Sequence, residues 1–274
     1  MTVFERRQLA QLADRRRRED WLCGRLLAKR VVADWLAESF VFSADGQRPD
    51  IAAGPRPATP GHELHRVAEL EIRSQDGHGR GVRPTVWLRT ELQPWPLSIT
   101  HGKRSVAVAL SKNPGLRVGV DLVDLPAGSG RAPLCRPAQL RFWMTEAERR
   151  WLDRRPEPWG PLLLWALKEA AYKAAHADNE PFRPHAWEVV PGEPARAKDA
   201  ELSKGLSAQF WCSCLRGGSR CQLTAVVEDN EILAFAVATQ SVTAHGAKDT
   251  DPISDGGHVA VTQAASWREV RVRR

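Results

Sequence analysis

The sequence predicts an α+β protein made of two similar halves. Apolar side chains recur at near-helical spacing through residues 6–38, where no proline interrupts them, so a helix broken at most once is expected there. A second helix is expected at residues 161–175, which begin with proline and are rich in leucine and alanine. Strands follow the first helix and flank the second. This order divides the chain near residues 113–119 into an N-terminal half, 1–115, and a C-terminal half, 116–240.

The strands are predicted from short apolar runs bounded by turn-forming residues. In the N-terminal half they are expected at residues 64–73, 85–90 and 105–110. These follow a stretch at 46–61 that is too rich in Pro and Gly to hold a regular element. In the C-terminal half strands are expected at residues 117–124, 186–190, 208–214, 221–227 and 232–239, the last two forming a hairpin around 228–231.

Three further segments complete the predicted organisation. Thr145 and Glu148 have the spacing of a capping box, which predicts a short helix from residue 145 to about 152. Residues 125–137 are rich in Pro and Gly and are expected to form a loop. From residue 241 the composition turns to polar and small residues, so 241–274 are expected to be a loosely ordered tail.

Composition limits the class of protein. Of the 274 residues, 42% are hydrophobic and 27% charged, as in soluble globular proteins. The longest strongly apolar stretches, 161–167 and 232–238, are far shorter than the roughly 20 residues of a membrane span. The N-terminus lacks a signal-peptide core, and the five cysteines contain no C-x-x-C pair. A cytoplasmic protein with reduced thiols and no membrane contact is therefore expected.

The positive charge is concentrated at the N-terminus. The net charge is +7, and residues 1–30 carry nine Arg or Lys against four acids, which is +5 of that total. Such a cluster indicates a polyanionic partner: a phosphate-rich cofactor, a nucleic acid or an acidic protein face. Within it, Arg18, Arg25 and Lys29 share one face of the expected helix and could grip several phosphates. The alternative is a solvated basic face.

Two carboxylates and a lysine are candidates for chemistry. Trp165, Glu169 and Lys173 are spaced four residues apart and share one face of the second helix, where a solvated ion pair is the simpler interpretation. Asp121 points away from the apolar side of its strand and could equally be a solvent-side residue. Together, Asp121 and Glu169 could bind a hard divalent cation such as Mg²⁺.

Ser98 and His101 precede the strand at 105–110. Small hydroxyls beside a histidine at a strand entrance can contact phosphate or other polar ligand atoms. A turn with local Ser and Thr hydrogen bonds is the alternative.

Four motifs follow one another along the chain. They are L-x-G-R at residues 22–25, S-x-[ST]-H at 98–101, G-[VI]-D at 119–121 and W-x-x-K-E-x-x-x-K at 165–173, the last being complete and the most specific. In this order, across roughly residues 15–239, the chain resembles the Sfp-type 4′-phosphopantetheinyl transferases. The resemblance implies two α+β halves with pseudo-twofold symmetry and coenzyme A in the cleft between them. It also implies the reaction: Mg²⁺-dependent transfer of the 4′-phosphopantetheine arm of coenzyme A to a serine of an apo acyl or peptidyl carrier protein, with release of 3′,5′-ADP.

The resemblance implies roles for individual residues. It places Asp121 and Glu169 on the metal and makes Glu169 the base for the carrier serine. It gives Lys173 the role of stabilising the developing phosphate charge. The residues that it implies for the phosphates of coenzyme A are Ser98, His101, Lys173, Arg25 with Arg18 or Lys29 as helpers, and Arg83.

One position departs from the family pattern. The family usually has a second acid two residues after the first, where this chain has Val123; Asp124 comes one residue later. Strand alternation is expected to turn Asp124 to the face opposite Asp121, unless a bulge intervenes. A water could then replace the missing ligand.

Two alternatives to an active transferase stay open on the sequence. A nucleic-acid-binding module could be built from the basic helix and some of the eleven tryptophans. An inactive transferase relative would share every motif, so that only an assay separates it from the enzyme. For the enzyme we expect a monomer that binds no nucleic acid. Its client pathway, whether fatty acid, polyketide or nonribosomal peptide synthesis, is left open.

Overall fold

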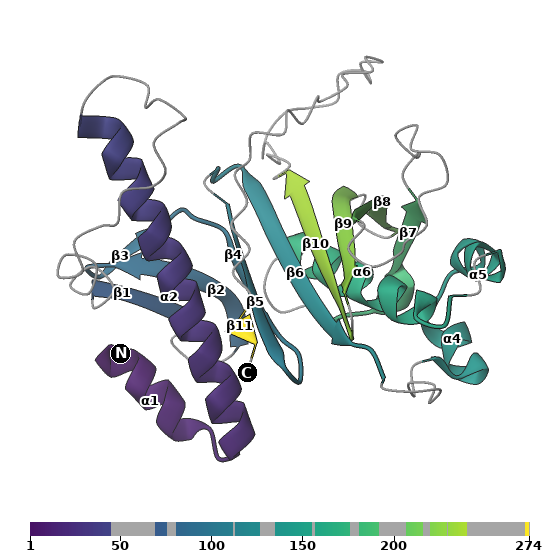
Figure 1. The fold of residues 1–274 in the computed structure, drawn as a ribbon, viewed down its shortest axis with the longest axis horizontal. Helices are drawn as coiled ribbons and strands as arrows, with labels where there is room; N and C mark the ends of the chain where they lie inside the picture. The colour runs from purple at the N-terminus through teal and green to yellow at the C-terminus, as the bar shows by residue number, and fades with distance from the viewer. Residues whose placement is uncertain are drawn as a thin grey trace, which may run out of the picture.

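The computed structural model describes residues 1–44, 69–75, 81–111, 113–126, 135–154, 157–175, 181–191, 207–215, 220–228, 230–239 and 272–273 (Figure 1). These residues form a mixed α+β fold, which confirms the predicted class. The Pro- and Gly-rich stretch 46–61 and all but two residues of the expected tail 241–274 lie outside the described residues. None of the helices in the described ranges is long and apolar enough to cross a lipid bilayer.

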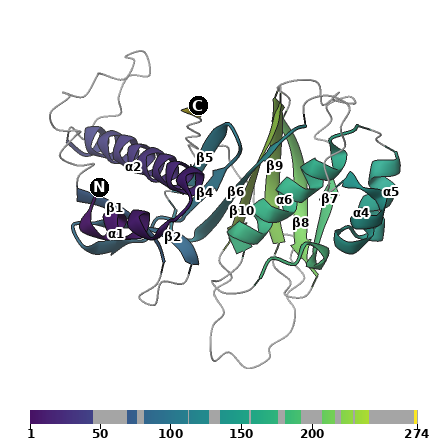
Figure 2. The same ribbon diagram turned by 90° about the horizontal axis from the view of Figure 1, so that it is seen from below.

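In the N-terminal part, the described residues form helices that lie beside two small antiparallel sheets (Figure 2). The helices are α1 (Val3–Gln11) and α2 (Arg15–Ala44). One sheet contains β1 (Leu70–Gln75), β2 (Gly81–Leu88) and β3 (Glu91–Gln93). The other contains β4 (Leu97–His101), β5 (Ser105–Leu110) and a two-residue strand, β11 (Val272–Arg273), that pairs with β5. Buried apolar residues of α2, such as Val31 and Val32, form one core with residues of both sheets.

The expected long helix is broken once, at residues 12–14. Asp14 explains the break, because its Oδ1 accepts a hydrogen bond from the Arg17 N–H at 2.7 Å and so caps the start of α2. After the break the two helices diverge, and α1 packs against both α2 and β1.

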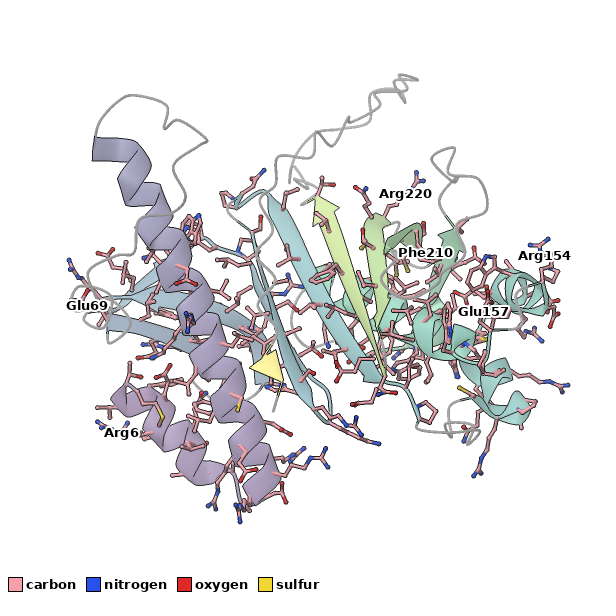
Figure 3. All side chains as sticks on the ribbon, in the orientation of Figure 1. Arg6, Glu69, Arg154, Glu157, Phe210 and Arg220 are labelled. Atoms are coloured by element: carbon pink, nitrogen blue, oxygen red, sulfur yellow. The ribbon has the colours of Figure 1, made fainter. Side chains whose placement is uncertain are left out.

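The C-terminal part is one antiparallel sheet covered by a helix. Its strands lie in the order β6 (Leu116–Asp124), β10 (Glu231–Thr239), β9 (Arg220–Glu228), β8 (Ser207–Cys214) and β7 (Trp187–Pro191). Helix α6 (Gly160–Ala175) packs on β6, β10 and β9. The helices α4 (Pro137–Trp143) and α5 (Glu146–Asp153) lie toward β7 (Figure 1). Phe210 of β8 (Figure 3) meets Trp151 of α5 edge-on, with ring centroids 6.1 Å apart.

The two parts meet along β6, the edge strand of the larger sheet. A small core of apolar residues joins β5 to the face of β6 and β10: Ala107, Ala109, Val118, Val120, Leu122 and Leu233. From β4, the Ser98 hydroxyl accepts a hydrogen bond from the Val120 N–H at 3.1 Å. Strand β6 therefore has α6 on one face and the β4–β5 hairpin on the other side, so side chains on both of its faces are buried.

Several predicted elements are confirmed and others need correction. The β9–β10 hairpin and the Thr145–Glu148 capping box are present as predicted. The turn alternative for the residues around Ser98 is wrong, because they form β4, a strand of their own paired with β5. Strand β3 and helix α4 were not predicted. They contain three and seven residues, too few for a periodic pattern to show.

Candidate active site

Close packing of α6 on β6 creates the candidate site. A Cβ on Gly119 would overlap the Ala170 carbonyl oxygen and lie 2.7 Å from the Ala174 backbone nitrogen. Only glycine lets the helix backbone approach the strand this closely. This close approach brings Lys173, near the C-terminal end of α6, over Asp121 of β6.

Lys173 joins the two predicted carboxylates. Its Nζ lies 2.7 Å from Oδ1 of Asp121 and 3.2 Å from Oε1 of Glu169. Asp121 is almost fully buried, with 4% of its surface exposed, whereas the side chains of Glu169 and Lys173 are 30% and 25% exposed. The solvent-side interpretation of Asp121 is therefore wrong: β6 is buried on both faces. The three groups form a charged constellation that is open to solvent on the Glu169 side.

Two further side chains orient these carboxylates. The Thr100 hydroxyl of β4 donates to Oδ1 of Asp121 at 3.1 Å. The Trp165 indole Nε1 donates to Oε2 of Glu169 at 3.1 Å. Thr100 comes from the N-terminal part and Trp165 from the helix itself, so the site depends on elements from both parts of the chain.

The surroundings shift the pKa values of Asp121 and Lys173. Burial raises the pKa of Asp121, and the nearby charge of Glu169 adds to that rise, while Lys173 and Thr100 oppose it. Burial lowers the pKa of Lys173, but attraction to Asp121 and Glu169 outweighs that effect and raises it above its ordinary value. Lys173 therefore keeps its positive charge at neutral pH.

Part of the chain matches a known family. Residues 117–225, from β6 through α6 to β9, match the model of the 4′-phosphopantetheinyl transferase superfamily. This segment is a 4′-phosphopantetheinyl transferase superfamily domain. It contains all three members of the charged constellation, Asp121, Glu169 and Lys173. A search of curated proteins gives no match to the chain.

His101 lies just outside the transferase domain, beside α2. It is exposed at the end of β4, and a Cβ on Gly24 of α2 would come within 2.6 Å of its Nε2. The glycine of the L-x-G-R motif thus makes room for the histidine of the S-x-[ST]-H motif. His101 directly follows Thr100 in β4, so strand alternation turns its side chain to the opposite face, toward α2. Ser98, by contrast, is buried on the β6 side of β4.

Arg25 follows Gly24 in α2 and has 5% of its surface exposed. One Nη donates to the Ser74 hydroxyl, and the guanidinium lies 4.9 Å from the centroid of the Trp21 ring. Its Nε has no hydrogen-bond acceptor among the described residues. Burial lowers the pKa of Arg25 to about 10, so the side chain is still charged at neutral pH. An anion that reached this site would find an unsatisfied donor.

The predicted basic stripe is not a continuous exposed surface. Lys29 is 3% exposed and forms an ion pair of 2.7 Å with the fully buried Glu5 of α1. Arg18 is exposed, and its guanidinium donates to the Leu12 and Ala13 carbonyls between the two helices. Helical spacing shows which residues share a face but not whether that face is buried, and here most of it is buried.

Arg83 of β2 lies at the C-terminal end of α6. Its Nη2 donates to the carbonyl oxygens of Lys173 at 2.6 Å and Ala174 at 3.4 Å. A cation here compensates both the unpaired carbonyls and the negative end of the helix dipole. Its described contacts therefore belong to the packing of the transferase domain against the N-terminal part.

The departure at Val123 is resolved by the register of β6. Residues 116–124 pair with β10 one for one, without a bulge. Val123 thus shares the face of Asp121, and Asp124 points the opposite way, where its Oδ2 accepts a hydrogen bond from the Lys103 N–H at 2.7 Å. The expected alternation is confirmed, and Asp124 stands apart from the constellation.

With Asp124 set aside, Asp121 and Glu169 are the carboxylates that could bind a metal ion. No group of three or more His, Cys, Asp or Glu side chains suited to a metal is found within the described ranges. Asp121 and Glu169 do present oxygens around one shared cation, the Lys173 ammonium. Two carboxylate ligands fit Mg²⁺, which usually keeps several waters and takes its other ligands from substrate phosphates.

Sequence reasoning missed two residues of the site. Thr100 lies within the S-x-[ST]-H motif without an implied role, although its hydroxyl touches both Asp121 and Lys173. Gly24 lies within the L-x-G-R motif without an implied role, yet its missing side chain leaves space for His101. Strand alternation could have pointed to Thr100, because side chains two residues apart lie on the same face of a strand, and Thr100 is two residues after Ser98.

Proposed function

We propose that the chain transfers the 4′-phosphopantetheine arm of coenzyme A to a serine of an apo acyl or peptidyl carrier protein, releasing 3′,5′-ADP. The Asp121–Lys173–Glu169 constellation inside a 4′-phosphopantetheinyl transferase superfamily domain is the observation that supports it. In this reaction the serine oxygen bonds to the phosphorus that carries the pantetheine arm. The bond between that phosphorus and the oxygen of the departing 3′,5′-ADP breaks.

The residues of the constellation suit separate parts of this step. Glu169 is the more exposed carboxylate and is the candidate to take the serine proton. Lys173, positively charged and next to both carboxylates, can neutralise charge that develops on phosphate oxygens. Asp121 and Glu169 would hold Mg²⁺. When bound, that ion neutralises charge on the pyrophosphate oxygens.

In this proposal the phosphates of coenzyme A bind where β4 and α2 lie side by side. His101 is exposed there, and Arg25 carries a charge with an unsatisfied Nε–H among the described residues. Lys29 and Arg83 have structural partners that would have to be given up to reach a phosphate. The proposal therefore favours His101 and Arg25 over the other basic candidates. Arg25 and Lys29 are too buried to contact a nucleic acid, whereas the arginines at 15–18 of the same helix are exposed.

Mass spectrometry of carrier proteins tests the function. The chain is incubated with coenzyme A, Mg²⁺ and a panel of apo carriers, and each carrier is weighed before and after. One or more carriers should gain one phosphopantetheine arm, and omission of Mg²⁺ should prevent the gain. If no carrier gains mass while coenzyme A and Mg²⁺ still raise the melting temperature, the chain is an inactive relative.

Replacement of Lys173 tests the role of the constellation. Lys173→Ala should lower turnover by about 100-fold or more, which is the usual cost of removing one group that stabilises transition-state charge. Lys103→Ala is the matched control, because Lys103 is an exposed lysine of the β4–β5 turn. Normal turnover of a folded Lys173→Ala protein would contradict the role.

A further inference from the structure

A fully buried lysine lies directly before Glu169 in the chain. Lys168 has 0% of its surface exposed, and its Nζ lies 2.7 Å from Oε2 of Glu148, which is also fully buried. The same ammonium donates to the backbone carbonyl of Trp143 at 2.8 Å and to that of Pro184 at 3.0 Å. Its three donors thus fix the end of α4, the start of α5 and the segment before β7.

Glu148 is as completely engaged as its partner. Its Oε2 accepts a hydrogen bond from the Thr145 N–H at 2.9 Å, which closes the capping box of α5. Its Oε1 accepts one from the Val189 N–H of β7 at 2.7 Å. Apolar residues of similar volume often stabilise a core at least as well as a buried ion pair. A stability role alone therefore does not account for this arrangement.

The segments that Lys168 fixes also carry the rings around Trp165. Trp143 meets Trp165 edge-on with centroids 5.4 Å apart, and Phe182 does so at 5.5 Å. The backbone of Trp143 is held directly by Lys168, and Phe182 stands two residues before Pro184, which is also held. Trp165 in turn donates to Oε2 of Glu169 at 3.1 Å.

We propose that Glu148 and Lys168 are positioning residues for Glu169. With its partner Glu148, Lys168 holds the backbone of Trp143 and that of Pro184, two residues after Phe182. The rings of Trp143 and Phe182 hold the Trp165 indole, and the indole N–H fixes the direction of the Glu169 carboxylate. The inference rests on the proposed transferase function, because it assigns the pair to the candidate base. It predicts that the pair influences turnover although neither member touches substrate.

Magnetic resonance of the indole N–H groups tests the geometry without any substrate. The Trp165 signal is assigned by its loss in Trp165→Phe, which keeps most of the ring packing. In the double variant Glu148→Gln/Lys168→Met, which removes both charges together, the Trp165 signal should shift. The matched control is Glu146→Gln/Arg149→Met, which removes the solvent-exposed pair of the same helix and should leave the signal in place.

Steady-state kinetics test the consequence. Loss of an aligning hydrogen bond should lower kcat by about two- to tenfold, with the Michaelis constant for coenzyme A unchanged. If Glu148 and Lys168 act through Trp165, the double substitution should lower kcat little further in a protein that already carries Trp165→Phe. Such non-additivity is expected of residues that act as one unit. Additive losses, or losses that only follow the melting temperature, would show a merely structural pair and overturn the proposal.

Two outcomes separate this proposal from the proposed function. An unmoved Trp165 signal in the folded double variant overturns the positioning role whatever the activity. Failure of the wild-type chain to modify any carrier overturns the transferase function but leaves the magnetic resonance test valid. If the double variant does not fold, Phe182→Leu keeps both charges and loosens one flanking ring. An unchanged Trp165 signal and unchanged kcat in that variant would then overturn the proposal.

Discussion

Gly119→Ala should damage both the stability and the turnover of the protein. The added Cβ would overlap the Ala170 carbonyl and lie 2.7 Å from the Ala174 nitrogen, where ordinary contacts are 3.4–4 Å. Both atoms belong to the α6 backbone, so the helix itself has to retreat, by about 1 Å. Overpacking of this kind typically costs about 1–3 kcal/mol of folding free energy, or roughly 2–10 °C in melting temperature for a chain of this size.

The same displacement should reach the chemistry, because α6 carries Glu169 and Lys173. A shift of about 1 Å at a reacting group can reduce turnover about 100-fold. Thermal unfolding and carrier modification are measured side by side. Gly115→Ala is the control: it precedes the same strand, and its Cβ would meet only the Asn113 Oδ1, at 3.2 Å. Wild-type melting and turnover in Gly119→Ala would refute the claim that close packing of β6 and α6 builds the site.

Three other variants test separate parts of the structure. Glu5→Gln leaves Lys29 buried without its partner and should cost about 3–5 kcal/mol at pH 7. The partner Lys29 lowers the pKa of Glu5 against the opposing effect of burial. The difference in unfolding free energy between wild type and Glu5→Gln is therefore fully present above pH 4.5 and should shrink as Glu5 becomes protonated at lower pH. Urea unfolding of both proteins across pH measures it. Val123→Glu adds a carboxylate on the face of Asp121 and should lower the Mg²⁺ concentration for half-maximal activity; an unchanged Mg²⁺ titration would contradict the assigned face. Arg83→Gln removes the cap of α6 and should lower the melting temperature with an unchanged Michaelis constant for coenzyme A, whereas a raised constant would make Arg83 a phosphate ligand.

The sequence predicted the central elements because they carry strong local signals. The run of apolar residues around Asp121 and the spacing of Glu169 and Lys173 were enough to place a strand and one helix face. They could not show that the strand and the helix touch. That contact depends on Gly119, and a glycine inside a strand is as readily interpreted as a bulge.

The sequence says least where burial, rather than periodicity, decides the outcome. Arg25 and Lys29 look like a surface stripe in sequence, yet α1 folds back and supplies Glu5 as a buried partner for Lys29. Nothing local to α2 indicates that partner, which lies 24 residues away. The turn alternative for residues 98–101 is wrong because this segment pairs with β5 as a strand, a contact that the local sequence does not show.

The environment of Asp121 depends on the N-terminal part although the residue lies in the transferase domain. Its hydrogen-bond donor Thr100 belongs to β4, and Ser98 of the same strand holds the neighbouring Val120 N–H. Arg83 of β2 caps the helix end that carries Lys173. Without these contacts Asp121 would lose a donor and become exposed on an edge strand, and the burial that raises its pKa would vanish. The family match at residues 117–225 therefore covers Asp121, Glu169 and Lys173, while the positions and charges of these side chains are set by the two parts together.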